Sequence, residues 1–335
     1  MSSTKGKTLY LNKKSMDYVT FGKGKQPLVI IPGLGDGLQT VKGKAQLFSL
    51  SYRLLAKRYK IYVFSRINEL RQGYTTWDMA ADVAEAMETL NLDTAYVMGI
   101  SQGGMIAQWL AADFPEKVQK LILAVTTAKP SQLARERIEH WQKLSQSGNF
   151  KHLMLDIAKH SYTQKSYQKW RLLYNIMGRL GRIKDENRIA IQSQSCLEHD
   201  SLEVLKEIQC PTLVLGALED DVIGVDGSKE LAKAISGCQL LILKHSGHAL
   251  YEENKVFQKF NHIINCVGPG LSSGTDKDDF GIKGEGWSRK FLLNYCDGTA
   301  VYGKMPAADQ KGKFIGTVTE ENIKALGDDN IDTKT

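Results

Sequence analysis

The sequence lacks several features that would assign it to a specialised class of protein. No apolar run approaches the ~20 residues that a membrane-spanning helix needs, and the first residues contain no apolar stretch of the kind found in secretory signals. Its five cysteines are scattered and include no C-x-x-C pair, which argues against a disulfide framework and against structural zinc. No internal repeat is visible. We therefore expect a cytoplasmic protein with reduced thiols and no membrane partner.

Signals for nucleic acid, metal and cofactor are also missing. The formal charge of +7 is spread over 335 residues, with acidic residues between the basic ones and no compact box of basic and aromatic residues. No H-x-x-x-H or other metal-ligand spacing occurs on a predicted helix. We expect no nucleic-acid partner, no metal and no cofactor. We expect the protein to act on a small-molecule substrate and to be a monomer or homodimer.

What is present is the composition of a folded globular protein with an alternating strand and helix rhythm. The chain is 42% hydrophobic and 24% charged. Short apolar runs alternate with helical patterns up to about residue 125 and return after residue 210, which predicts a mostly parallel β-sheet flanked by helices. A helix capped by Thr75 and Asp78 is expected between two of the strands. The predicted strands cover residues 18–22, 27–33, 60–65, 94–100, 119–125, 211–217 and 238–245.

Two segments interrupt or follow this rhythm. Residues 130 to 205 are predicted to be helical and rich in basic and aromatic residues, and residues after Cys266 are rich in glycine, serine and aspartate like a linker. Asp297 and Gly298 then carry a hairpin signal, and a strand-like KFIGTV and a capped helix follow. We recognise no family in this tail. The predicted parts are a core in two pieces, 1–129 and 206–267, a helical insert, 130–205, and a linker with a small extension, 268–335.

The stretch VMGISQGGMIAQ, residues 97 to 108, places Ser101 in a G-x-S-x-G motif between a predicted buried strand and a predicted buried helix. Such a turn exposes the hydroxyl above the sheet edge, and the helix behind it offers unpaired N–H groups to an oxyanion. Gly99 and Gly103 fit a turn in which strand and helix approach too closely for side chains. The alternative is a glycine-rich turn in which the serine is incidental.

A base and an acid follow two other predicted strands. His248 lies in Ser-Gly-His-Ala directly after the strand at 238–245, and Glu-Asp-Asp at 219 to 221 follows the strand at 211–217. Serine needs a base to take its proton, and that base needs an orienting group. The chain order of serine, acid and histidine is the order expected for this type of nucleophile turn. Three strand ends are therefore predicted to converge on one site.

Together these stretches resemble the α/β-hydrolase family over residues 20 to 266. IIPGLGDG at 30 to 37 is similar to the family's oxyanion loop, VMGISQGGMIAQ to its nucleophile elbow, CPTLVLGALEDDVIG to its acid turn and HSGHALYEE to its histidine loop. The resemblance implies an α/β-hydrolase fold with an inserted helical cap and a C-terminal extension. It further implies Ser101 as nucleophile, His248 as general base and Asp220 as orienting acid, with backbone N–H groups of Leu34 and Gln102 forming the oxyanion hole.

Two departures from the family pattern accompany the resemblance. Pro32 stands where the family often has histidine, and SRINELRQGYTT stands where it often has an aspartate-arginine-glycine turn. The choice of acid also leaves alternatives, because Glu219 and Asp221 adjoin Asp220. His245 is expected to be structural. Four further histidines fall in the insert, where surface or hydrogen-bonded structural roles are expected: His140, His152, His160 and His199.

The position of the insert matches the cap of the resembled family, which would exclude water and shape specificity. Its apolar residues could line a pocket or only pack the helices together: Trp141, Met154, Trp170, Tyr174 and Met177. Its basic residues could favour an anionic acyl group or lie on solvated helix faces: Arg135, Arg137, Lys165, Lys169 and Arg171.

The function implied is that of a serine hydrolase cleaving a small carboxylic ester, thioester or lactone through an acyl-enzyme. Hydrolysis of a carbon-carbon bond beside a ketone, and acyl transfer, would use the same three residues. A ligand sensor or binding protein with little turnover is an alternative of another class. No long amphipathic apolar lid is visible in the insert, so membrane lipids are not the expected substrates.

Overall fold

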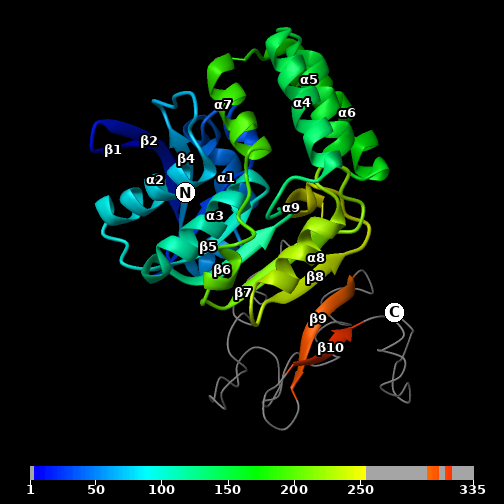
Figure 1. The fold of residues 1–335 in the computed structure, drawn as a ribbon. Coiled ribbons are helices and arrows are strands. Elements are labelled where there is room, and N and C mark those ends of the chain that lie inside the picture. The colour runs from blue at the N-terminus through cyan, green and yellow to red at the C-terminus, as the bar shows by residue number, and fades with distance from the viewer. Residues whose placement is uncertain (1–3, 184, 254–299, 309–313, 319–335) are drawn as a thin grey trace.

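One sheet organises the fold, with strand order β1-β2-β4-β3-β5-β6-β7-β8-β9-β10 (Figure 1). The computed structural model describes residues 4–183, 185–253, 300–308 and 314–318. The six strands from β4 to β8 in this order are parallel, and the two pairs at the ends are antiparallel, which confirms the predicted mostly parallel sheet. The strands are β1 Gly6–Leu11, β2 Lys14–Phe21, β3 Gln26–Ile31, β4 Tyr59–Ile67, β5 Ala95–Ile100, β6 Val118–Ala124, β7 Thr212–Ala217, β8 Gln239–Leu243, β9 Ala300–Ala308 and β10 Phe314–Val318.

Helices cover both faces of the sheet because the central strands are apolar on both faces. Val29 and Ile31 of β3 pack in one buried cluster with α2, α3 and α8, whereas Leu28 and Ile30 pack in the other cluster with α1 and part of the insert. Each such fully buried side chain stabilises the fold by ~1.5–3 kcal/mol. The helices are α1 Ala45–Ser51, α2 Thr76–Thr89, α3 Gln102–Asp113, α4 Gln132–Gln146, α5 Phe150–Ser161, α6 Gln164–Leu180, α7 Glu186–Leu197, α8 Val225–Ala234 and α9 Leu250–Glu253.

Two predicted helices form as their sequences indicate. α2 begins with a complete capping box, in which the Thr75 side chain accepts from the Asp78 backbone N–H and the Asp78 carboxylate accepts from Thr75. α3 is buried over most of its length and packs on β3, β5, β6 and α2, while α2 also packs on β4. The helix that begins after Ser101 is thus packed on both the sheet and its neighbouring helix.

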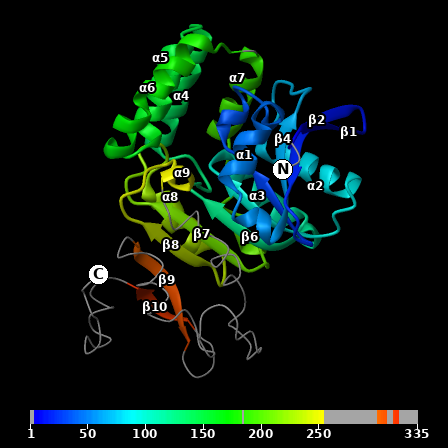
Figure 2. The same ribbon diagram turned by 180° about the vertical axis from the view of Figure 1, so that it is seen from behind.

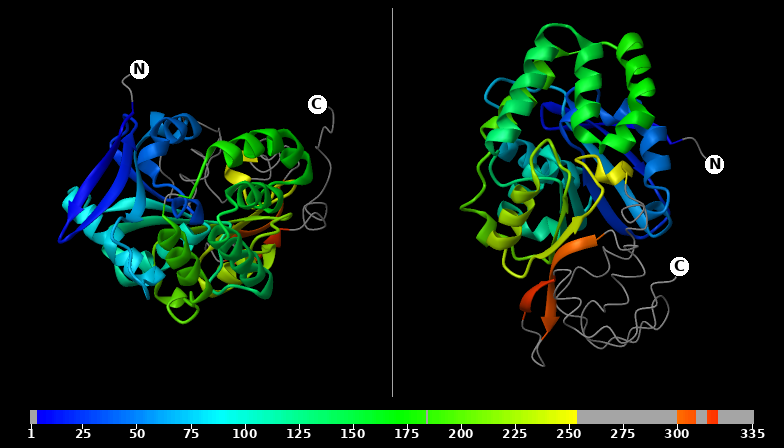
Figure 3. Two further views of the ribbon diagram at one scale, coloured as in Figure 1. Left: turned by 90° about the horizontal axis from the view of Figure 1, so that it is seen from above. Right: turned by 90° about the vertical axis from the view of Figure 1, so that its right-hand side faces the viewer.

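The helices α4 to α7 are interposed between β6 and β7, inside the range predicted as an insert. α4 packs on α5 and α7, and α5 packs on α6, so three of them form a bundle beside the carboxyl ends of the strands (Figures 2 and 3). Each helix begins at a side-chain N-cap: Ser131, Asn149, Thr163 and Asp185. The domain boundaries at 130, 206 and 268 stay predictions.

Several elements were missed or lie outside the described residues. β1 is an exposed edge strand and α1 is short, so neither has a strong periodic signal. α7 lies inside the range predicted to be helical, and its buried residues mix polar Arg188 and Gln192 with apolar Ile189 and Ile191. The described part of the strand-like KFIGTV stretch, Phe314–Val318, forms β10, and β9 extends the main sheet by pairing with β8. The Asp297-Gly298 turn and the capped helix predicted after KFIGTV fall outside the described residues.

Candidate active site

Ser101 lies at the sharp turn between β5 and α3. Its φ of 53° and ψ of −121° belong to a strained region that side chains rarely adopt. Added Cβ atoms would lie 1.9 Å from the Ile31 carbonyl oxygen at Gly103, and 2.4 Å from the Gly103 carbonyl oxygen at Gly99. The steric reason given for both glycines is therefore confirmed. The turn is held by the Ser101 N–H, which donates to the Ala124 carbonyl over 2.9 Å.

The structure brings His248 to this serine. The distance between His248 Nε2 and Ser101 Oγ is 3.0 Å, and the imidazole is buried. The loop that carries His248 is anchored on both sides, because the Ala249 N–H donates to the Ser161 carbonyl and the Gly247 N–H donates to the Glu253 carboxylate, each over 2.7 Å. The histidine ring is thereby held in a position from which Nε2 can accept the serine proton.

Among the three neighbouring acids, Asp220 is the one that contacts His248. Its two carboxylate oxygens lie 2.9 and 3.1 Å from Nδ1, and one of them also accepts from the backbone N–H groups of Val222 and Ile223. A carboxylate only accepts, so Nδ1 carries the proton and Nε2 is free to accept from the serine. Glu219 faces His245 instead, with 3.6 Å between the nearest atoms.

Asp221, the other alternative, joins the core to the insert. Its carboxylate accepts from Arg137 Nη2 of α4 over 3.0 Å and lies 2.5 Å from His160 Nδ1 of α5. Partial burial acts to raise the pKa of Asp221, but the hydrogen bonds from His160 and Arg137 lower it below its ordinary value. Two adjacent carboxylates thus have different partners. Asp220 contacts the His248 imidazole, whereas Asp221 contacts α4 and α5.

The backbone N–H groups predicted for the oxyanion hole belong to the first residues of two helices, one a short 3₁₀ helix and the other α3. Leu34 begins the 3₁₀ helix Leu34–Asp36, and Gln102 begins α3. Neither N–H has a hydrogen-bond partner among the described residues. The loop before Leu34 touches the serine, since a Cβ added at Gly33 would lie 3.1 Å from Ser101 Cβ and 3.6 Å from its Oγ. Both donors are therefore close to the nucleophile and unpaired.

A buried arginine that the sequence analysis did not single out lies beneath these two segments. Arg66, at the end of β4, is fully buried and donates from Nη2 to the Pro32 carbonyl over 2.6 Å and to Gln102 Oε1 over 2.7 Å. The Gln102 amide in turn donates to the Gln192 carbonyl and Ser195 Oγ of α7. Burial lowers the pKa of Arg66 to about 10, so the guanidinium remains charged at neutral pH. One cation therefore links the two segments that present Leu34 and Gln102.

Asp36 supplies the counter-charge to this arginine. Its carboxylate accepts from Arg188 Nη2 over 2.6 Å and from the Arg66 backbone N–H over 3.2 Å. Burial acts to raise the pKa of Asp36, but the Arg188 and Arg66 guanidinium groups lower it below its ordinary value. The signal for this network was the unusual SRINELRQGYTT stretch, in which Arg66 interrupts an apolar strand. Its partners on α7 are distant in sequence and could not be inferred.

The remaining histidines and candidate pocket residues differ in burial. His199 is buried against Thr76, with 2.8 Å between Thr76 Oγ1 and His199 Nδ1, and burial lowers its pKa to about 4. His140 and His152 are exposed. Trp141 and Met154 are buried, Tyr174 is half-buried, and Trp170 and Met177 are exposed.

A second polar cluster that sequence reasoning missed connects the insert to the histidine loop. The Tyr162 hydroxyl contacts the Glu252 carboxylate and lies 3.1 Å from the Tyr174 hydroxyl. Burial raises the pKa of Glu252 above its ordinary value. Glu253 accepts from the Thr163 N–H over 2.9 Å while it also holds Gly247. The start of α6 is thereby attached to residues adjoining His248.

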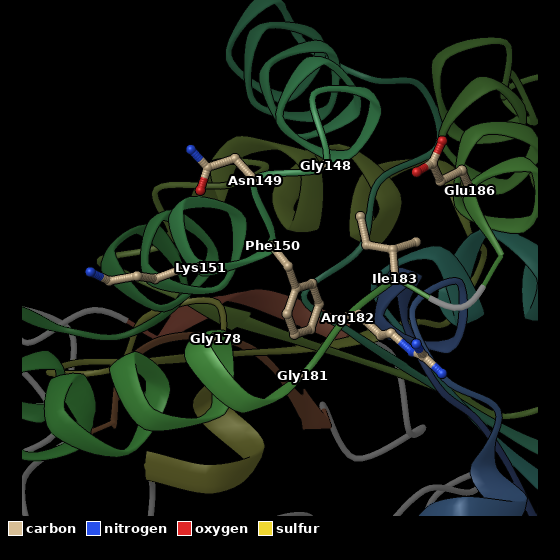
Figure 4. A pocket seen from close by; sticks show the side chains of 9 residues that line it. All are labelled: Gly148, Asn149, Phe150, Lys151, Gly178, Gly181, Arg182, Ile183 and Glu186. Atoms are coloured by element: carbon tan, nitrogen blue, oxygen red, sulfur yellow. The ribbon is translucent and has the colours of Figure 1, made fainter.

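A separate cavity of about 380 Å³ lies where α5 begins and α6 ends (Figure 4). The Phe150 ring and the Ile183 side chain face each other across it, and Lys151, Arg182 and Glu186 belong to its lining. None of the three residues at the Ser101 site lines this cavity. It is therefore distinct from the site at the strand ends.

The described part of the chain has three further features that bear on function. No group of three or more histidine, cysteine, aspartate or glutamate side chains there could hold a metal ion. Cys196, Cys210 and Cys238 are free thiols, whereas Cys266 and Cys296 lie outside the described residues. No described helix combines the length and apolar character needed to cross a membrane.

Comparison with known proteins gives consistent matches. The model of the alpha/beta hydrolase fold matches residues 26–255. A 3-oxoadipate enol-lactonase 2 from Acinetobacter baylyi is 24% identical, with 78% of this chain and 95% of the relative covered. The crystal structure of an enol-lactonase from Burkholderia xenovorans superposes with a TM-score of 0.66 at 19% identity, covering 77% of this chain and 99% of that one. MGS-M2, an alpha/beta hydrolase enzyme from a deep-sea metagenome library, reaches 0.68 at 20% identity, covering 82% and 100%.

Proposed function

The chain belongs to the alpha/beta hydrolase fold family, and from that premise we propose that it is a serine hydrolase cleaving a small carboxylic ester, thioester or lactone. The observation that carries the proposal is the continuous contact from Ser101 Oγ through His248 to the Asp220 carboxylate. The names of the enol-lactonase relatives support a lactone or related ester as the substrate class.

In the proposed first step, His248 Nε2 takes the Ser101 hydroxyl proton as Oγ attacks the carbonyl carbon. The Asp220 carboxylate holds the Nδ1–H and stabilises the imidazolium that forms. Negative charge develops on the carbonyl oxygen, where the N–H groups of Leu34 and Gln102 would donate, each such donor typically lowering the barrier by ~3 kcal/mol. Arg66 keeps these two donors in register through Pro32 and the Gln102 side chain.

In the proposed second step, the tetrahedral intermediate collapses and His248 returns its proton to the leaving oxygen or sulfur. The acyl group stays on Ser101, and in a lactone the leaving hydroxyl remains tethered to it. A water molecule then loses a proton to Nε2 as its oxygen attacks the acyl carbon. The second tetrahedral intermediate breaks its bond to Ser101 Oγ, which takes that proton back from His248, and the acid is released. The insert α4–α7 would act as the cap that limits water entry, with buried Trp141 and Met154 near the core.

Covalent labelling tests the proposal directly. We expect intact mass to show one fluorophosphonate adduct on the wild-type protein, no adduct on Ser101→Ala and full labelling of Ser147→Ala, which changes an exposed serine after α4. Turnover of short p-nitrophenyl esters and lactones should follow the same pattern. Absence of an adduct on folded wild-type protein would contradict the proposal and favour a non-catalytic binding protein.

Product analysis separates the chemistries that share this site. Added alcohol or amine acceptors that capture most of the acyl group would indicate acyl transfer in place of hydrolysis. Cleavage of a vinylogous diketone without ester turnover would indicate carbon-carbon hydrolysis. We expect neither, and we expect the free acid as the main product of an ester or lactone.

A further inference from the structure

Helix α6 exposes an apolar stripe to solvent. Half of the exposed large hydrophobic side chains in the described part of the chain lie on this one helix. Their exposed fractions run from 41% for Trp170 to 83% for Leu180. The six residues are Trp170, Leu172, Leu173, Ile176, Met177 and Leu180. A contiguous apolar patch of this kind usually marks an interaction surface.

The packing of α6 on α5 explains why this stripe is left uncovered. Gly178 is the only residue of α6 that is fully buried, and a Cβ there would lie 2.7 Å from Lys151 Cα. Residues 170, 173, 177 and 180 share one face of α6. Because Gly178 lies against α5, this face points away from the contact between the two helices. α6 lies on the outer side of the insert, opposite α7, in both Figure 1 and Figure 2.

The charge of α6 has one sign. Gln164–Leu180 contains four basic residues and no acidic residue. All four are exposed, and within the part of the chain that the structure describes none of them forms an ion pair: Lys165, Lys169, Arg171 and Arg179. Arg182 follows just after the helix. An amphipathic helix with tryptophan and leucine on one face and unpaired basic residues beside them suits an anionic lipid interface.

We propose that α6 docks the protein on an anionic lipid surface, with its apolar stripe in the interface and its basic residues at the headgroups. Charge decides between this occupant and a second copy of the chain. Two α6 helices placed face to face would bring together eight cations, four from each, with no carboxylate on either helix to offset them. A membrane carrying anionic lipid supplies both the apolar interior and the missing negative charge.

The docked helix would lie close to the candidate active site. The Trp170 ring is 6.5 Å from the Tyr162 ring, and Tyr162 packs against Ala249, the residue after His248. The docked helix would therefore lie beside the loop that carries His248. The inference goes beyond the proposed function and does not depend on it. It departs from the sequence-based expectation of no membrane partner, which rested on the lack of a spanning segment and of a visible amphipathic lid.

The test uses vesicle co-sedimentation of the full chain carrying Ser101→Ala, so that binding is measured without hydrolysis. We expect binding to phosphatidylcholine vesicles that contain phosphatidylglycerol and at least about tenfold weaker binding to phosphatidylcholine alone. The difference should shrink as salt is raised. If the wild-type protein showed no fluorophosphonate adduct at Ser101, the proposed hydrolase would be refuted. The vesicle binding of Ser101→Ala would still stand as a separate result.

Two pairs of substitutions locate the contact. Lys169→Gln with Arg171→Gln should weaken binding to anionic vesicles about 25-fold, since each charge near the surface contributes about fivefold. Leu172→Ser with Leu180→Ser should weaken it at least about tenfold by removing inserted apolar area. The matched controls, Lys233→Gln on α8 and Leu202→Ser after α7, should change binding less than about twofold because both lie outside α6.

Three results would overturn the inference. The first is no binding to either vesicle by folded protein, as judged by circular dichroism. The second is binding that the α6 substitutions leave unchanged. The third is a dimer in light scattering that dissociates in Leu172→Ser with Leu180→Ser, without vesicle binding, which would assign the stripe to a second copy of the chain.

Discussion

The carboxyl edge of the sheet and the outer helix of the insert use cations in opposite ways. Arg66 and Arg188 are buried, and their guanidinium groups meet Asp36, Pro32 and Gln102 at hydrogen-bond distance. On α6, the basic residues are exposed and lie beside apolar side chains. A buried cation must be matched in position by its partners, whereas an exposed one is tolerated wherever the helix places it. Substitutions in the two regions should therefore differ sharply in cost.

The largest effect is expected at Asp220. Asp220→Asn should keep the fold but lower kcat by about 10⁴-fold, because the amide can no longer hold the Nδ1–H tautomer of His248. Asp221→Asn is the matched control. It weakens the contacts of residue 221 with Arg137 and His160 but leaves the contact between Asp220 and the His248 imidazole in place. Steady-state kinetics on one ester measures both. Equal losses in the two variants would mean that Asp220 is not the orienting acid.

Arg66→Met is expected to rank second, with effects on both stability and rate. It leaves the Pro32 carbonyl and the Gln102 amide oxygen without their buried donor, and it removes one of the two cations facing Asp36. Each buried acceptor left without its donor costs about 1–3 kcal/mol in the free energy of unfolding. Disordered oxyanion donors should lower kcat about 10²-fold with little change in KM.

Urea unfolding and the separate kcat and KM values test this expectation. Exposed Arg53→Met serves as control and should stay within about 0.5 kcal/mol of the parent protein. A merely structural Arg66 would lower stability while leaving the kcat of the folded enzyme intact. That result would mean that Arg66 does not position the Leu34 and Gln102 N–H groups.

His199 should make stability depend on pH. Burial lowers its pKa from 6.5 to about 4, so between these values the unfolded chain binds a proton that the folded chain does not. The contribution of this group is fully present above pH 6.5 and falls as the pH drops toward 4, by about 3 kcal/mol in total. His199→Gln should flatten this part of the urea stability profile. Exposed His152→Gln should leave it in place, and an unchanged slope in His199→Gln would contradict the assignment.

The smallest effect is expected in α6. Leu172→Ser replaces a side chain that is 67% exposed, so the free energy of unfolding should change by no more than about 0.5 kcal/mol. Thermal and urea unfolding measure it. If the free energy of unfolding fell by several kcal/mol, Leu172 would be packed within the protein. Substitutions in α6 and in the Arg66 network would then have similar costs.

Much of the fold could be predicted because its signals are local. Apolar runs of strand length, the Thr75 capping box and the glycines around Ser101 each act over a few residues, and the structure places the corresponding elements as expected. The meeting of Ser101, Asp220 and His248 also follows from a simple rule, because the carboxyl ends of parallel strands share one edge. β1 and α1 escaped prediction because the first is an exposed edge strand and the second is short.

The sequence alone determined the parallel sheet, the strained turn at Ser101 and the order of the three candidate catalytic residues, because periodicity and steric limits operate along the chain. Only the tertiary structure decided which carboxylate faces His248, that Arg66 joins the Pro32 carbonyl to the Gln102 side chain, and that α6 turns its apolar stripe outward. Those outcomes depend on contacts between residues 28 to 122 positions apart, such as Asp220 with His248 and Arg66 with Arg188. No local pattern in a single chain encodes such pairings, since their free energy arises only when the elements pack.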